Sequence, residues 1–180
     1  VAAAYCCWAT EGIKNRTKIT TDIEEVMSNN NTFTQDTLCV GVSYRIEDIP
    51  ALVQYFHTYL LPYQVLTLTG PLGAGKTTFV SKLLRSYGIT EAITSPTFTY
   101  VNVYSTDNGQ TFYHFDLYRI ASLDEFLQAG FDEYLYQPNS LVIIEWPEVI
   151  MPLLTHSVCH VALDYAADLD TRVVKVTLGA

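Results

Sequence analysis

The chain has 180 residues, enough for one domain with a sizeable hydrophobic core but too few for two, and its 49% hydrophobic content excludes an intrinsically disordered chain. Its net charge is −9, and the ten basic residues are scattered, with Lys14, Arg16 and Lys18 as the only loose cluster. A protein that grips nucleic acid by itself needs several basic side chains on one face. The composition therefore argues against direct RNA or DNA binding and favours a protein partner or a basic complex.

Cysteine usage and hydropathy indicate a cytoplasmic protein that does not contact a membrane. The four cysteines, at positions 6, 7, 39 and 159, lack the spacing of a metal site, so reduced thiols are expected. No apolar run approaches the ~18 residues of a membrane helix. The opening VAAAYCCWA lacks the basic segment of a signal peptide. Because the chain begins with Val1 and not Met, the true N-terminus and any organelle targeting stay open.

The first part of the chain differs in pattern from the rest. Residues 1–37 are polar and rich in Asn and Thr, which predicts an extension or linker. A compact domain is predicted over residues 38–180. It opens with a strand at 38–43. The segment 47–62 follows, with apolar residues at the i, i+3 and i+4 spacing of a helix that ends at its terminal proline.

The later segments alternate between strand and helix. A β-branched strand at 64–69 leads into a glycine-rich loop, and from residue 97 a period of two with Asn108-Gly109 at the tip predicts a hairpin. Strands interleaved with helices predict an α/β domain with a mixed sheet. The remaining predicted segments are a helix at 76–87, hairpin strands at 97–104 and 111–116, short helices at 123–130 and 132–135, a continuously apolar strand at 141–146, and strands at 157–165 and 171–178.

The segment GPLGAGKTTF contains the pattern G-x-x-x-x-G-K-[ST], formed by Gly70, Gly75, Lys76 and Thr77. Glycines let the backbone turn so that successive N–H groups point at phosphate oxygens, and the helix that follows adds the positive end of its dipole. The lysine reaches the β- and γ-phosphates, and the threonine hydroxyl joins the Mg²⁺ shell. Since a strand precedes the loop and a helix follows it, the sequence predicts a nucleotide-binding P-loop.

Two carboxylates are candidates for the acidic residue that such a site needs at the end of a neighbouring strand. Glu145 ends the apolar run LVIIE, and Asp116 ends FYHFD. We expect Glu145 to be the metal-linked acid because its strand reads as buried on both faces. Asp116 is then free to orient the attacking water or the switch region.

Further candidates flank these carboxylates. SPTF at 95–98 is placed where a switch segment would sense the γ-phosphate, although an ordinary turn is the alternative. Arg119 is expected to form an ion pair with Asp116, or else to stabilise charge during the reaction. Trp146 could stack on a base or a partner, with core packing as the alternative.

In this order and at these spacings, the motifs resemble the bacterial tRNA threonylcarbamoyladenosine biosynthesis ATPase family TsaE, also called YjeE. The resemblance covers residues 38–180. The P-loop is generic, whereas SPTF, HFDLYR and EWPE together are specific to that family. The segments that carry the resemblance are GPLGAGKTTF, SPTFTYVNVY, YHFDLYR, EFLQAGFDEYL and IIEWPE.

The resemblance implies a P-loop NTPase fold with a mainly parallel mixed sheet flanked by helices. It implies slow hydrolysis of ATP, with ATP and Mg²⁺ as the cofactors. It also implies a heterodimeric partner of the TsaB–TsaD type, which transfers the threonylcarbamoyl group to an adenosine beside the anticodon and is reset by ATP hydrolysis. The chain would then meet tRNA only through that complex.

The resemblance also implies residue roles. Thr97 is the implied switch threonine, and Asp116 and Lys76 are required for hydrolysis. Thr77 and Glu145 hold Mg²⁺, and Trp146 lies close to the nucleotide or the partner. The residues implied to bind the phosphates are Leu72, Gly73, Ala74, Gly75, Lys76, Thr77 and Thr78.

The chain departs from the family pattern in two places. The first helix carries IPALVQYF where the family usually has a Thr and a Leu-Gly pair, which leaves open the nucleotide contact expected around 44–46. The family often has Gly-Arg near the C-terminus, where this chain has ADLDTR, so Arg172 is an open replacement.

Two other functions share the same loop. A small-molecule kinase would need an acceptor pocket and usually an Arg-rich lid, whereas the five arginines here are spread singly. A nucleotide-dependent interaction module that no longer hydrolyses is the other alternative, and the intact Lys76, Thr77, Asp116 and Glu145 argue against it. The absence of an Asn-Lys-x-Asp run favours ATP over GTP only weakly.

Overall fold

The computed structural model describes residues 39–59, 62–168 and 170–178. The predicted extension at residues 1–37 lies outside the described residues. No helix in the described ranges has the length and apolar character needed to cross a bilayer.

A seven-stranded mixed sheet forms the centre of the fold, with the strand order β1-β7-β6-β2-β5-β4-β3. The inner strands β6, β2, β5 and β4 run parallel, while β3, β7 and β1 add antiparallel pairings at the two sides. The mixed sheet is therefore as predicted, with its parallel part confined to the middle. The strands are β1 Cys39–Arg45, β2 Val65–Thr69, β3 Val101–Ser105, β4 Thr111–Asp116, β5 Ser140–Glu145, β6 Val158–Tyr165 and β7 Thr171–Leu178.

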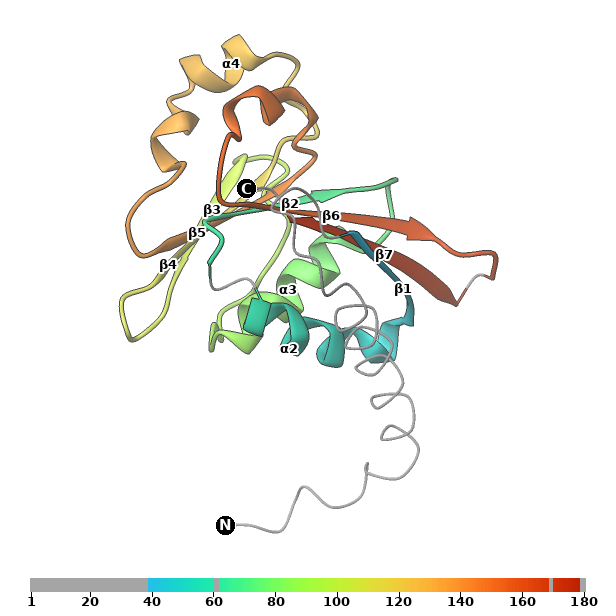
Figure 1. The fold of residues 1–180 in the computed structure, drawn as a ribbon. Helices are drawn as coiled ribbons and strands as arrows, with labels where there is room; N and C mark the ends of the chain where they lie inside the picture. The colour runs from blue at the N-terminus through green and yellow to red at the C-terminus, as the bar shows by residue number, and fades with distance from the viewer. Residues whose placement is uncertain (1–38, 60–61, 169, 179–180) are drawn as a thin grey trace.

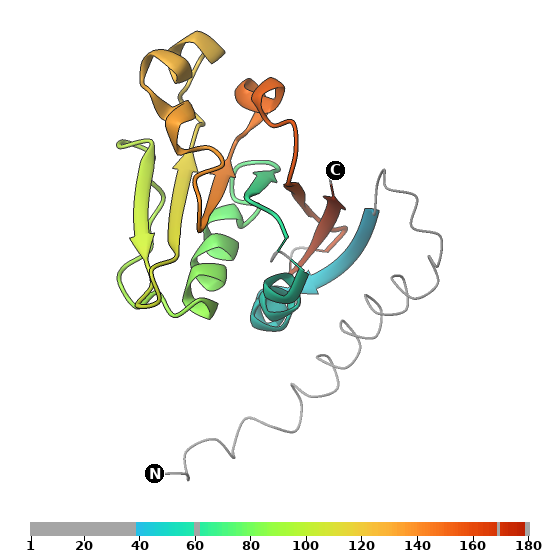
Figure 2. The same ribbon diagram turned by 60° about the vertical axis from the view of Figure 1, so that its left-hand side comes forward.

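Helical segments cover both faces of the sheet. The helices α2 (Ile49–Tyr59) and α3 (Lys76–Ser86) lie on one face, and α4 (Leu123–Gln128) lies beyond the other (Figure 1). Turned by 60°, the same arrangement shows α2 and α3 side by side beneath the strands (Figure 2). The 3-10 segments are η1 Ile46–Asp48, η2 Phe131–Tyr134 and η3 Glu148–Leu153. These layers confirm the predicted α/β class.

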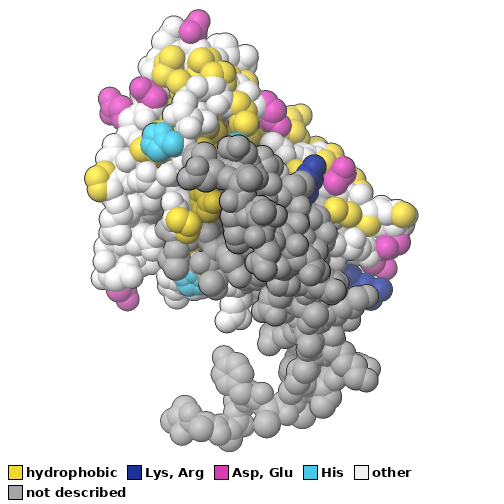
Figure 3. Space-filling view, viewed as in Figure 1, with side chains coloured by type: hydrophobic (Ala, Val, Ile, Leu, Met, Phe, Trp, Pro, Cys, Tyr) yellow, Lys and Arg dark blue, Asp and Glu magenta, His cyan; other side chains and the backbone are white. Residues whose placement is uncertain are grey.

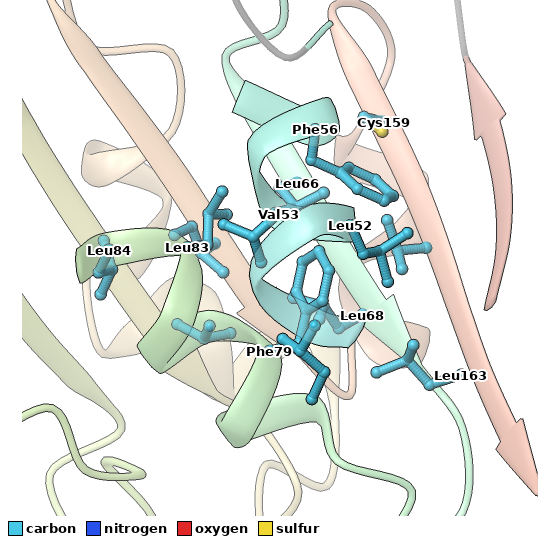
Figure 4. Packing of buried hydrophobic residues seen from close by; sticks show 14 of the residues in the cluster. Leu52, Val53, Phe56, Leu66, Leu68, Phe79, Leu83, Leu84, Cys159 and Leu163 are labelled. Atoms are coloured by element: carbon cyan, nitrogen blue, oxygen red, sulfur yellow. The ribbon is translucent and has the colours of Figure 1, made fainter. Parts of the chain in front are cut away.

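The core consists of two buried clusters separated by the sheet. Between the sheet and the helices α2 and α3, side chains from β2, β6 and both helices interdigitate (Figure 4). On the other face, Phe115 packs edge-on against Phe131 and Tyr134. All six residues of β5 are buried, because this strand contributes to both clusters. The continuous apolar run therefore formed the doubly buried strand that the sequence predicted.

The hairpin is confirmed, but its first strand begins later than predicted. The alternating pattern suggested a strand from residue 97, whereas β3 begins at Val101 and residues 97–100 form a turn. The Tyr100 amide donates to the Pro96 carbonyl at 2.7 Å, and Tyr100 has a φ of 64°. The side chains of Ser95 and Thr97 hydrogen-bond Asp116, which holds this segment in a turn.

Candidate functional site

The glycine-rich loop connects β2 to α3 at the carboxyl end of the parallel strands. Gly70 has a φ of 132°, and a Cβ there would lie 2.0 Å from the Leu163 carbonyl oxygen. A Cβ on Gly73 would lie 2.8 Å from the Tyr165 hydroxyl, which itself donates to the Leu72 carbonyl at 2.7 Å. The backbone of β6 therefore requires glycine at position 70, and at position 73 the φ of 80° favours glycine.

The loop ends at Gly75, and α3 begins at Lys76, as predicted. The first amides of a helix have no intrahelical acceptor, so this end offers donors and a positive dipole to an anion. The Ala74 amide donates within the loop to the Pro71 carbonyl at 3.2 Å. Leu72 and Thr78 are exposed, whereas Ala74 is buried.

Lys76 is 5% exposed, and its ammonium group lies inside the loop. Nζ donates to the carbonyls of Gly70 at 2.7 Å and Pro71 at 3.0 Å, and it lies 3.7 Å from the centroid of the Trp146 ring. Burial lowers the pKa of Lys76, and the nearby carboxylates of Glu145, Glu148 and Asp116 oppose that shift. The ammonium group of Lys76 is therefore bound to the loop carbonyls, with acidic side chains nearby.

Glu145 ends β5 and is 2% exposed. Its Oε2 accepts a hydrogen bond from the Thr77 hydroxyl at 3.0 Å, and its Oε1 lies 2.9 Å from Nε2 of His114. The residues predicted to hold a metal, Thr77 and Glu145, are thus in direct contact.

A magnesium ion fits this pair chemically, because Mg²⁺ prefers hard oxygen ligands and usually adds substrate phosphates and water to one or two protein ligands. Across the part of the chain that the structure describes, no group of three or more His, Cys, Asp or Glu side chains could hold a metal ion. A metal at Thr77 and Glu145 would therefore take its further oxygen ligands from bound phosphate and water.

Asp116 ends β4 directly opposite Glu145 in the parallel register. Its Oδ2 accepts from the hydroxyls of Ser95 at 2.5 Å and Thr97 at 2.9 Å, and its Oδ1 accepts from the Tyr118 amide at 3.2 Å. The predicted switch threonine and the predicted hydrolytic aspartate are therefore in contact.

Trp146 follows Glu145 in the chain, and its ring lies against the ammonium group of Lys76. Its φ of 59° is unusual for a bulky residue, and its amide donates to the Leu68 carbonyl at 3.1 Å. The indole ring is partly buried and lies 5.0 Å from the Tyr118 ring. The strained backbone thus places an aromatic ring on the P-loop lysine.

The expected ion pair between Arg119 and Asp116 is wrong for the described residues. The guanidinium carbon of Arg119 lies 4.6 Å from the centroid of the Phe98 ring. Asp116 instead receives three hydrogen bonds from neutral donors. Phe98 is 83% exposed, so the Arg119–Phe98 pair lies on the surface, with Phe98 as the last residue of the predicted switch segment.

A cavity of about 270 Å³ lies beside the loop. Both places that the sequence left open, residues 44–46 and Arg172, contribute to its wall. Burial raises the pKa of Tyr44, partly offset by the positive charge of Arg172. Arg172 also lies 4.7 Å from the centroid of the Tyr165 ring. The lining residues are Tyr44, Ile46, Ile49, Gly73, Ala74, Gly75, Thr78, Asp170 and Arg172.

Three contacts of the site were not predicted from the sequence. Ser95 shares the Asp116 oxygen with Thr97, His114 contacts Glu145, and Tyr165 holds the loop. The alternation of β4 carried a signal for His114, because residues 114 and 116 must lie on the same face of a strand. No local pattern pointed to Tyr165, since it is 93 residues away from its partner.

The acidic composition is visible on the surface. On the face shown in Figure 3, the basic side chains of the described residues are sparse and do not gather into a patch, while acidic side chains lie at several separate places. The described residues therefore form no basic patch for nucleic acid on this face.

Comparison with known proteins identifies the family. Residues 44–174 match the family model described as threonylcarbamoyl adenosine biosynthesis protein TsaE. The tRNA threonylcarbamoyladenosine biosynthesis protein TsaE of Rickettsia felis is 39% identical over 119 residues, 66% of this chain and 68% of that protein. The protein of the same name from Bacillus subtilis is 33% identical over 133 residues, 74% of this chain and 82% of that protein.

A solved structure confirms the fold. The crystal structure of Bacillus subtilis YdiB superposes with a TM-score of 0.63 at 28% sequence identity, covering 82% of this chain and 90% of that one. The fold class is therefore the P-loop NTPase type predicted from the sequence. Together with the match to the family model, this shows that the chain belongs to the TsaE family of tRNA threonylcarbamoyladenosine biosynthesis proteins.

Proposed function

We propose that this chain is the Mg²⁺-dependent ATPase subunit of the system that installs threonylcarbamoyl on the adenosine next to the tRNA anticodon. The observation that carries the proposal is the meeting of three charged groups at one end of the sheet. Lys76 begins α3 and bonds the loop through its ammonium group, and Asp116 and Glu145 end paired strands directly opposite each other. Phosphoryl transfer needs this set: a cation for the phosphates, an acid near the metal and an acid near the water.

The loop and the start of α3 bind the phosphates. Residues 72–78 supply backbone donors and the helix dipole, and Lys76 supplies the positive charge. In the structure, Lys76 Nζ hydrogen-bonds its own loop and contacts Trp146. Binding a triphosphate exchanges these carbonyl contacts for phosphate oxygens, with which a cation interacts more strongly.

The two carboxylates divide the remaining work. Thr77 and Glu145 would hold Mg²⁺, which supplies neutralising charge for the phosphates when bound. Asp116 orients the attacking water and accepts its proton. Thr97 hydrogen-bonds Asp116 and belongs to a turn outside the regular elements, so it is suited to sense the γ-phosphate.

The cavity beside the loop takes the base and ribose of ATP. Its volume of about 270 Å³ and its wall of Tyr44, Ile46 and Ile49 suit a flat apolar ring. Arg172 on the same wall carries a positive charge toward the nucleotide.

The partner is a protein complex of the TsaB–TsaD type, and ATP hydrolysis resets that complex between turnovers. A chain of net charge −9 is poorly suited to hold tRNA directly, so tRNA is met through the complex. The reaction takes place in the cytoplasm. Residues 38–180 form the ATPase domain, with residues 1–37 as an extension.

The test is ATP turnover by the purified chain, alone and with a purified TsaB–TsaD-type pair. Expected are slow release of inorganic phosphate by the chain alone, faster release with the pair, and restored threonylcarbamoyl transfer to tRNA over many cycles. Transfer of the γ-phosphate to a small acceptor would instead indicate a kinase. Nucleotide binding with no turnover under either condition would indicate an interaction module that does not hydrolyse.

A further inference from the structure

We propose that His114 is a positioning residue for the metal-binding carboxylate: its Nε2–H fixes the orientation of Glu145 so that Oε2 faces Thr77. This inference rests on the proposed magnesium site. It assigns a role to a residue that lies outside the P-loop motif.

Among the described residues, the Glu145 carboxylate is the one hydrogen-bond partner of the His114 ring. His114 is 0% exposed, and Nε2 lies 2.9 Å from Glu145 Oε1. Nδ1 is also buried and has no hydrogen-bond partner among the described residues. Buried polar groups are normally hydrogen-bonded, so the contact with Glu145 is the one that satisfies this buried ring.

Strand register explains how the two side chains meet. His114 is paired with Ile143 and Asp116 with Glu145 in the parallel ladder of β4 and β5. Side chains at alternate positions share a face, so His114 lies on the same face as Asp116 and the buried Phe112. From there it reaches Glu145 diagonally, since Glu145 is two pairs further along the ladder than Ile143, the residue paired with His114.

The carboxylate needs such a contact because its terminal torsion is soft. Rotation about the last bond of a glutamate side chain is broad and roughly two-fold, so one hydrogen bond leaves the carboxylate plane free to turn. Thr77 binds Oε2 and His114 binds Oε1, so the plane is fixed from both sides. Partners of metal ligands orient those ligands in this way.

Two isosteric variants of the full-length chain test the inference. In His114→Gln the side-chain amide nitrogen can occupy the place of Nε2 and donate to Glu145. In His114→Asn the amide nitrogen is at the place of Nδ1 and cannot reach. His160→Gln is the matched control, since His160 is also in the sheet and bonds a strand hydroxyl, that of Thr67, at 2.8 Å.

The measurement is ADP affinity by calorimetry across a Mg²⁺ titration and in EDTA. For His114→Asn, the Mg²⁺ concentration that gives half of the metal-dependent gain in affinity should rise by about 10- to 100-fold, with affinity in EDTA unchanged. His114→Gln and His160→Gln should stay within about twofold of wild type. Thermal unfolding without nucleotide checks that each variant is folded.

A second readout does not depend on nucleotide or on a folded Asn variant. Long-range ¹H–¹⁵N spectra of the wild-type chain, with the His114 signals assigned by their loss in His114→Gln, should show a protonated Nε2. A bare Nε2 facing Glu145 would overturn the inference.

Other outcomes also decide it. A His114→Asn protein with the wild-type Mg²⁺ requirement, or one weakened equally in EDTA, overturns the inference, as does a His114→Gln protein no better than His114→Asn. If the ADP affinity of the wild-type chain does not depend on Mg²⁺, both the proposed magnesium site and this inference are overturned. That result can be told apart from failure of the His114 inference alone, because the ADP affinity of the control variant then does not depend on Mg²⁺ either.

Discussion

The two carboxylates at the ends of β4 and β5 face each other in one register, but they are held by different kinds of structure. The partners of Glu145 are Thr77 on α3 and His114 on β4, both in regular elements. The side-chain partners of Asp116 are Ser95 and Thr97, which lie in the irregular segment between α3 and β3, with Thr97 at the start of its turn.

This difference indicates how the site divides its work. A helix and a sheet hold a side chain at a fixed position, which suits a residue that orders a metal and phosphates. Turns connect regular elements and move more easily, which suits a residue whose contacts change when a γ-phosphate arrives or leaves. We therefore expect changes at Glu145 to alter metal binding and changes around Asp116 to alter turnover.

Replacing Lys76, which lies near both carboxylates, should impair nucleotide binding as well as turnover and give the largest effect. Lys76 is the cation of the loop, and the negative charge of Glu145 acts on it more strongly than that of Asp116. Lys76→Ala should weaken ATP binding by roughly 10- to 100-fold, the value of hydrogen bonds to a charged group, and should remove measurable turnover. Lys82→Ala, on the exposed side of the same helix, is the control. Unchanged ATP affinity by calorimetry would count against the loop as the phosphate site.

Asp116→Asn should separate turnover from binding. The amide keeps the shape but cannot accept a proton from water, and a positioned base typically contributes about 10²- to 10⁴-fold. Phosphate release should fall by that order while ATP affinity stays close to wild type, and Asp107→Asn at the exposed hairpin tip should change neither. If binding is lost instead, Asp116 has a metal or structural role and the division of work is wrong.

Glu145→Gln should change metal binding and leave the maximal turnover largely intact, in contrast to Asp116→Asn. Without a negative charge the oxygen is a weaker magnesium ligand, so the Mg²⁺ concentration for half-maximal activity should rise by about 10-fold or more, with turnover largely recovered at high Mg²⁺. Activity measured across a Mg²⁺ titration checks this, with Glu133→Gln on the exposed η2 as the control. A Mg²⁺ dependence equal to wild type would remove Glu145 from the metal site.

The sequence predicted those parts of the molecule that depend on local pattern. The period of two marked β4, the apolar run marked β5, and the glycine-lysine-threonine motif marked the loop and the start of α3. The motif also named the residues that the structure brings together, because a strand end, a loop and a helix start need only their own sequence to form.

Contacts that depend on register or on distant segments could not be read in the same way. The His114–Glu145 contact requires β4 and β5 to be paired in one particular register, which neither strand encodes alone. Residues 97–100 alternate like a strand, yet the hydroxyl bonds to Asp116 keep them in a turn, a tertiary contact that overrides propensity. The cavity combines β1, the loop and β7, so its wall is visible only after folding.

The smallest predicted effect comes from removing the hydroxyls that bond Asp116. It tests most directly whether Asp116, unlike Glu145, is held by the segment between α3 and β3. Ser95 and Thr97 both donate to Asp116 Oδ2, and their own oxygens lie 2.6 Å apart. A neutral hydrogen bond contributes about 0.5–1.5 kcal/mol, so Ser95→Ala and Thr97→Val should each lower turnover by roughly 2- to 13-fold.

The double variant is the decisive measurement at this position. Groups that share one acceptor do not act independently, so the combined loss should differ from the product of the two single losses. Single-turnover rates of the four proteins, with Thr99→Ala in the same turn as the control, give this coupling directly. Strictly multiplicative losses would mean that Ser95 and Thr97 act separately. Asp116 would then be held by its strand, as Glu145 is, and not by a movable turn.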